Sequence, residues 1–108
     1  MIKAHFFKQK GNIRKFSISG HASYGEKGED IVCAGVSACC EMTINAITEI
    51  LKVPAKVVID SNDTSIVCSL PDDFIHSSAF VFVESFLLEL KVMNNNYPDA
   101  IELAVYEV

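Results

Sequence analysis

The sequence predicts one α+β domain over residues 1–108, in which five strands form a mixed, mostly antiparallel sheet beside two helices. Three observations predict this fold. Alternating apolar residues flank a glycine-containing turn near the start, two later stretches repeat apolar residues at helical spacing, and segments rich in β-branched residues follow each of these stretches. The predicted order of elements is ββαββαβ. Half of the residues are hydrophobic and 21% are charged, which is typical of a globular chain.

The first two strands are predicted to form a hairpin. Ile2, Ala4 and Phe6 occupy every second position of the first strand. The segment QKGN then supplies turn chemistry, and the alternation resumes with Phe16 and Ile18 on one face of the second strand.

The first helix is predicted to run from Asp30 to about Lys52. Asp30 is a good N-cap residue, and an apolar row at helical spacing follows it. That row consists of Val32, Val36, Cys40, Ile44, Ile47 and Leu51. The segment before it, HASYGEKGE, is predicted to be a solvated loop, because it is polar and contains two glycines.

The second half of the chain repeats the pattern of two strands and a helix. VPAKVVIDSNDTSIVCSL contains two short strands around a turn at residues 61–63. Pro71 and two aspartates open a second, strongly apolar helix, NNNYPD ends it, and AIELAVYEV forms the last strand. This helix is too apolar to be half exposed in a monomer, so we expect either a central position or a dimer interface.

The net charge and the hydropathy of the chain limit the kinds of partner that we expect. Nine basic and fourteen acidic residues give a net charge of −5, whereas a phosphate-binding surface needs the opposite balance. We therefore expect no direct nucleic-acid contact; the charge suits a basic protein partner, or serves solubility only. No apolar run reaches the roughly 18 residues that a membrane span needs, and the start does not have the pattern of a signal peptide. A soluble, cytoplasmic protein is expected.

The four cysteines differ in their predicted settings. No C-x-x-C motif and no zinc-site spacing is present, so we expect reduced thiols and no bound metal. Cys39, Cys40 and Cys68 are best interpreted as small buried hydrophobic residues. Cys33 follows Asp30 by three positions and is expected in the first helical turn, where free N–H groups and the helix dipole stabilise a thiolate.

His21 and Cys33 together predict a thiol hydrolase. Taken alone, a histidine at a strand end is usually structural, and a cysteine near a helix start is as often inert as reactive. A short loop between them, however, brings the strand end and the helix start to one edge of the sheet. His21 would then accept the thiol proton and later protonate the leaving group, while first-turn N–H groups could bind the oxyanion.

Other residues of the same region are candidates for supporting roles. Asp30 caps the helix and could also orient His21. Ser37 lies one turn after Cys33, so its hydroxyl could approach the thiol, or bond back to a carbonyl of its own helix. The glycine-bearing segment is either an ordinary connection or a mobile loop that closes over substrate; its residues are Gly25, Glu26, Lys27 and Gly28.

These residues resemble the signature of the ribosomal-processing cysteine protease (Prp) family. The resemblance rests on Gly20-His21-Ala22, the two loop glycines, and the block Asp30-Ile31-Val32-Cys33-Ala34 with Ser37. It implies an endopeptidase domain with Cys33 as nucleophile, His21 as general base and acid, and Asp30 and Ser37 in support. It also implies a homodimer, a mobile loop over the site, and no metal or cofactor.

The resemblance also implies the substrate. Members of the family remove a short N-terminal extension from the twenty-seventh protein of the large ribosomal subunit, which is a basic protein, and the extension has an aromatic-rich stretch before the scissile bond. The main alternative is a non-enzymatic, ribosome-associated module that binds a basic protein. A thiol redox sensor is a third possibility, although an intact helix holds Cys33 and Cys40 about 10 Å apart.

Overall fold

The computed structural model describes residues 1–20, 27–74 and 77–108. Its elements follow the predicted order ββαββαβ, which is confirmed. They are β1 (Ile2–Gln9), β2 (Asn12–Ser19), α1 (Lys27–Asn45), a π-helical turn (Ala46–Ile50), β3 (Lys56–Asp60), β4 (Ser65–Ser69), a 3-10 turn (Asp72–Phe74), α2 (Ala79–Asn96) and β5 (Ile101–Glu107).

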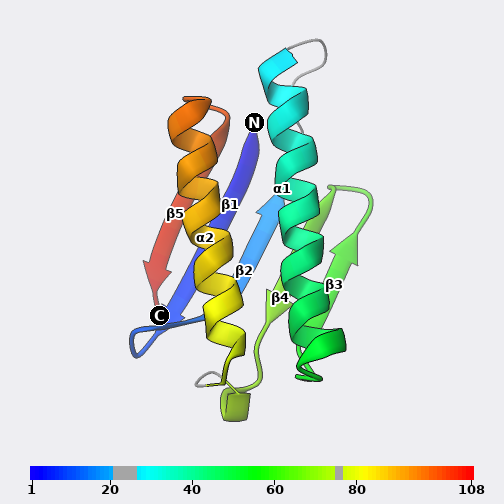
Figure 1. Ribbon diagram of the computed structural model, residues 1–108, viewed down its shortest axis with the longest axis vertical. Helices are drawn as coiled ribbons and strands as arrows, with labels where there is room; N and C mark the ends of the chain where they lie inside the picture. Colours follow the sequence, from blue (N-terminus) through cyan, green and yellow to red (C-terminus); the bar gives the residue numbers. More distant parts are fainter. Residues whose placement is uncertain (21–26, 75–76) are drawn as a thin grey trace.

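The five strands form one mixed sheet in the order β3-β4-β2-β1-β5. Three neighbouring pairs are antiparallel, and only β1 and β5 run parallel, from Ile2 opposite Ile101 to Lys8 opposite Glu107. Both helices lie on the same face of this sheet (Figure 1). The predicted architecture, an α+β layer with a mostly antiparallel sheet, is therefore confirmed.

A two-residue turn joins β1 to β2. Lys10 and Gly11 connect Gln9 to its partner Asn12, and both have positive φ angles, 54° and 85°. Positive φ at both central residues is typical of a type I′ turn, whose twist matches that of the flanking strands. Gly11 is the residue that adopts this conformation without strain.

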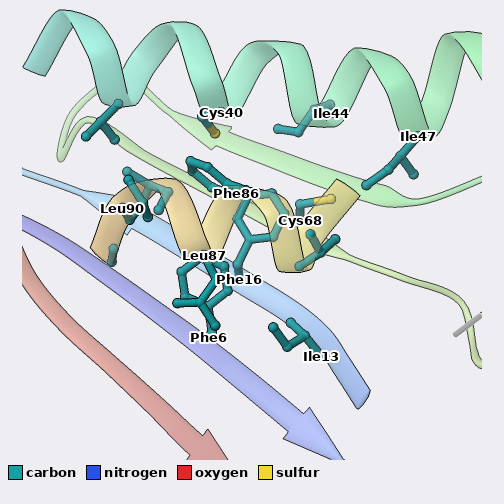
Figure 2. Packing of buried hydrophobic residues seen from close by; sticks show 14 of the residues in the cluster. Phe6, Ile13, Phe16, Cys40, Ile44, Ile47, Cys68, Phe86, Leu87 and Leu90 are labelled. Carbon is teal, nitrogen blue, oxygen red and sulfur yellow. The ribbon is translucent and has the colours of Figure 1, made fainter. Parts of the chain in front are cut away.

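The core lies between the sheet and the helices (Figure 2). Phe6 of β1, Phe16 of β2 and Phe86 of α2 meet there with ring centroids 5.2–5.8 Å apart. The two pairs that include Phe86 are edge-to-face, an arrangement that adds attraction beyond the buried area. These three rings attach α2 to the centre of the sheet.

α1 contributes the apolar row that the sequence predicted. Val32, Val36, Cys40 and Ile44 of α1 and Ile47 of the following π-helical turn are all buried, and Figure 2 shows the last three pointing toward the sheet. Leu51, the last residue of the predicted row, is half-buried. The opposite side of α1 is exposed although several of its residues are apolar. For that reason Ile31–Ile50, among the described residues, is long and apolar enough to cross a membrane, contrary to the expectation from the sequence.

α2 begins and ends later than predicted. Asp72–Phe74 forms a separate 3-10 turn, and the helix starts at Ala79, whose N–H bonds to the Ser77 hydroxyl oxygen. At the other end the helix continues through the three asparagines to Asn96, because the residue that stops it is Pro98, which disfavours helical geometry at Tyr97. The Asn94 side chain accepts the N–H of Ile101, which joins the helix end to β5.

The outer side of α2 is apolar and exposed. Its exposed side chains include Phe80, Val81, Phe82, Leu88 and Val92. Of the two positions expected for this helix, the central one does not occur: the sheet covers one side of α2, and nothing in the described part of the chain covers the other.

Ile47 and Ile50 form a matched pair for testing the core. Ile47 is 0% exposed and Ile50 is 76% exposed, within the same helical turn. Ile47→Ala should lower the free energy of unfolding by about 2–5 kcal/mol, because it leaves a cavity. Ile50→Ala should change it by less than about 0.5 kcal/mol. Urea denaturation followed by circular dichroism measures both; equal effects would contradict the described packing.

Candidate active site

A pocket of about 270 Å³ lies where α1 passes over the ends of β2 and the β3–β4 hairpin. Cys33 and Ser37 of α1, Gly20 at the end of β2, and Ile59 and Ile66 of the hairpin all line it. The pocket therefore brings together residues from three separate parts of the sequence.

α1 presents one row of residues to this pocket. Cys33, Val36, Ser37, Cys40 and Glu41 follow one another at spacings of three, one, three and one, so they lie on one side of the helix. Val36 and Cys40 in this row are also part of the core, which fixes the rotation of the helix about its axis. As a result the Cys33 thiol is half buried at the pocket wall, and Ser37 lies on the exposed rim one turn later.

The start of α1 differs from the prediction. The helix begins at Lys27, so Asp30 is its fourth residue and not its N-cap, and Cys33 lies in the second turn. Lys27 and Glu29 are good helix formers, and adding a residue to an existing helix costs little, so the helix extends back through Gly28. The N–H of Cys33 is consequently inside the helical ladder, and the expected oxyanion site of first-turn N–H groups beside the thiol is wrong.

The predicted mobile loop is also shorter than expected at its C-terminal end. Lys27 and Gly28 belong to α1. Gly25 and Glu26 lie outside the described residues. The sequence GEKG predicted a loop before the helix, because two glycines in four residues normally disfavour helical structure.

The position of His21 stays a prediction, because this residue lies outside the described residues. Its neighbour Gly20 is described and lines the same pocket as Cys33. Gly20 has a φ of +90°, and a Cβ atom there would overlap the carbonyl oxygen of Met1. Glycine is therefore required where the chain leaves β2, and this fixes the point from which residue 21 continues.

Cys40 and Cys68 are buried, as predicted, whereas Cys39, which was also expected to be buried, is half-buried. Burial, with a contribution from nearby Cys68, raises the pKa of the Cys40 thiol to about 12. Burial alone raises the pKa of Cys68 to about 11, and burial together with Glu89 raises that of Cys39. All four cysteines are free. Among the described residues, no group of three or more His, Cys, Asp or Glu side chains could hold a metal ion.

The hairpin between β3 and β4 forms the wall that the sequence did not reveal. Asp60, Ser61, Thr64 and Ser65 line the pocket opposite α1. The turn is fixed by two side-chain bonds: the Asp60 carboxylate accepts the N–H of Asn62 at 2.9 Å, and the Asp63 carboxylate accepts that of Ser65 at 3.1 Å. The sequence predicted a turn at residues 61–63 but not its place beside Cys33, because only the pairing of the strands brings the turn there.

The pocket is suited to binding an apolar side chain of another molecule while the Cys33 thiol reacts with a bond next to that side chain. The interior of the pocket is aliphatic, with Ile18, Val36 and Ile66 among its lining, and the carboxylates of Glu41 and Asp60 belong to its wall. When the pocket holds that side chain, the half-buried thiol in its wall can attack the neighbouring carbonyl group.

Comparison with known proteins gives a consistent result. Residues 1–102 match the family model described as cysteine protease Prp. The chain is 29% identical over 94 residues to the ribosomal processing cysteine protease Prp of Staphylococcus aureus (strain Mu50 / ATCC 700699), a match that covers 87% of this chain and 88% of that protein.

Two solved structures have the same fold. SMU.848 from Streptococcus mutans matches with a TM-score of 0.88 and 28% identity, over 100% of this chain and 99% of that one. The essential ribosomal processing protease Prp from S. aureus, in complex with a covalently linked product peptide, matches with a TM-score of 0.85 and 27% identity, over 97% of this chain and 99% of that one.

The burial of the cysteines predicts their order of alkylation. In native protein at neutral pH, iodoacetamide should modify Cys33 at least about a hundredfold faster than Cys40 or Cys68, because these two are buried and stay protonated. Above pH 11 the Cys68 thiol should ionise before that of Cys40. Peptide mapping by mass spectrometry over a time course measures the rates, and protein in concentrated guanidinium, where all four thiols should react alike, is the control. Equal labelling in the native state would contradict the described burial.

Proposed function

Since this chain belongs to the cysteine protease Prp family, and is thus a cysteine peptidase, we propose that it removes the short N-terminal extension of the twenty-seventh protein of the large ribosomal subunit. The observation that carries the proposal is the position of Cys33, a half-buried thiol in the wall of an open, largely apolar pocket. The S. aureus relative, which holds a covalently linked product peptide, supports a covalent reaction with a peptide.

In the proposed reaction Cys33 is the nucleophile and His21 is the general base and acid. His21 takes the proton of the thiol, and the sulfur attacks the carbonyl carbon of the scissile peptide bond. The C–N bond then breaks, the leaving amine takes the proton from His21, and the acyl group stays on Cys33 as a thioester. A water molecule that His21 deprotonates hydrolyses the thioester and restores the thiol.

Asp30 and Ser37 are proposed to support this pair. Asp30 precedes Cys33 by three residues in α1, and a carboxylate near His21 would favour the protonated imidazole. Ser37 lines the pocket one turn after Cys33, so its hydroxyl can hydrogen-bond close to the sulfur or to the substrate.

The charge of the protein and of the pocket agrees with a basic substrate. The net charge of −5 favours encounters with a basic ribosomal protein. Glu41 and Asp60 bring negative charge to the pocket itself. These charges act on the approach and orientation of the substrate and not on the bond that breaks.

Cleavage assays test the proposal. Wild-type protein should cut the precursor of the ribosomal protein, whereas Cys33→Ala and His21→Ala should lower kcat/KM by about a thousandfold or more, because each removes a reacting group. Cys39→Ala, at a half-buried cysteine that does not line the pocket, is the matched control and should retain activity. Mass spectrometry of the products measures the turnover. Full cleavage by Cys33→Ala would refute the mechanism, and stoichiometric binding without cleavage by wild type would favour the alternative of a non-enzymatic module.

We also propose that the protein is a homodimer in the cytoplasm. The exposed apolar side of α2 supports the dimer, because Leu88 is 63% exposed and Val81 and Val92 lie on the same helix. Light scattering should give about twice the chain mass of 11.9 kDa, and Leu88→Glu should shift the mass toward that of one chain. A single-chain mass for the wild type at micromolar concentration would contradict the dimer.

A further inference from the structure

β3 forms one edge of the sheet. It pairs with β4 on one side only, and no strand in the described part of the chain pairs with its other side (Figure 1). Because N–H and C=O groups alternate in direction along a strand, every second residue of β3 directs its backbone polar groups outward. Such an edge is a template for the addition of another extended chain.

The residues of β3 do little to protect this edge. Its centre is β-branched and apolar, with Val58 48% exposed and Ile59 71% exposed. Charges occur only at its ends, on Lys56 and Asp60, and its pairing with β4 is regular from end to end, without a bulge. Edge strands are usually blocked by proline, by central charges or by a bulge, none of which β3 has.

The edge leads directly into the pocket that contains Cys33. Ile59 and Asp60, the last two residues of β3, line that pocket, as does Ser61, which follows them. α1 forms the opposite wall with Cys33 and Ser37. A chain that lies along β3 therefore ends beside the pocket that the thiol lines.

We infer that β3 is the strand on which the substrate docks. An extended segment of the peptide adds to the sheet beside β3, and the next residues enter the pocket, where the scissile bond meets Cys33. The inference rests on the proposed peptidase function and specifies how the substrate binds. Backbone hydrogen bonds to β3 give affinity for any extended, unstructured peptide, and the aliphatic pocket of about 270 Å³ selects a large apolar side chain.

Amide exchange measured by NMR tests the docking strand. The probe is a peptide of the proposed N-terminal extension, bound to the Cys33→Ala protein so that it stays intact. Exchange of the outward-facing amides within residues 56–60 should slow by about tenfold or more. β5, the opposite edge strand of the same sheet, is the internal control and should not change. Binding of the peptide with unchanged exchange in β3 would overturn the inference.

N-methylation of the peptide provides a test that does not depend on the folding of a variant. Single N-methyl groups placed along the peptide should reduce kcat/KM by about tenfold or more at every second residue of the docked segment, because only alternate amides face β3. Equal sensitivity at successive residues, or none, would contradict strand addition.

The unmodified peptide separates the inference from the proposed function. If wild-type protein does not cleave it, or Cys33→Ala cleaves it fully, the proposed peptidase mechanism fails. If it is cleaved only with Cys33 present while exchange in β3 stays unchanged, the mechanism stands and strand addition alone is refuted.

Discussion

The packing of α1 against the sheet is the interaction on which the site depends. Successive residues of an α-helix are rotated by 100°, so burial of Val32 and Val36 determines where Cys33, between them, must point. Each fully buried aliphatic side chain of this row contributes about 1.5–3 kcal/mol, and the row continues to Ile47. Rotating the helix by one residue would expose much of the row, and it would move the thiol from the pocket wall into the core or into solvent. The position of the Cys33 thiol is thus maintained by hydrophobic burial.

A second constraint acts beside the pocket, at the end of β2. Gly20 passes so close to the carbonyl of Met1 that no side chain fits, and its backbone has a conformation that other residues adopt only with strain. Met1, which precedes β1, thereby restricts position 20 at the end of β2 to glycine. Position 20 consequently tolerates no residue other than glycine without strain, although it lies at the edge of the pocket and not in the core.

Much of the fold could be predicted from the sequence because its signals are local. The alternation in β1 and β2 and the apolar row from Val32 to Ile47 each follow from short-range periodicity. The starts of both helices could not be predicted, because Lys27 and Gly28 give conflicting propensities and the turn at Asp72–Phe74 has the same composition as a helix start. That Cys33 and Ser37 lie on one side of the first helix could be predicted from their spacing of four residues, and both line the pocket. The hairpin wall could not, because its place beside them arises from the pairing of β4 with β2, and no local pattern encodes that pairing.

The parallel pairing of β1 with β5 has a consequence for the biosynthesis of the protein. β1 comes from residues 2–9 and its neighbour β5 from residues 101–107, so this pairing is a contact between distant parts of the chain. Such contacts form late, because closing a long loop costs entropy before any contact repays it. α2 also stays incompletely anchored until then, since its Asn94 bonds to the first residue of β5. β1 therefore gains its parallel neighbour only after residues 101–107 have been synthesised.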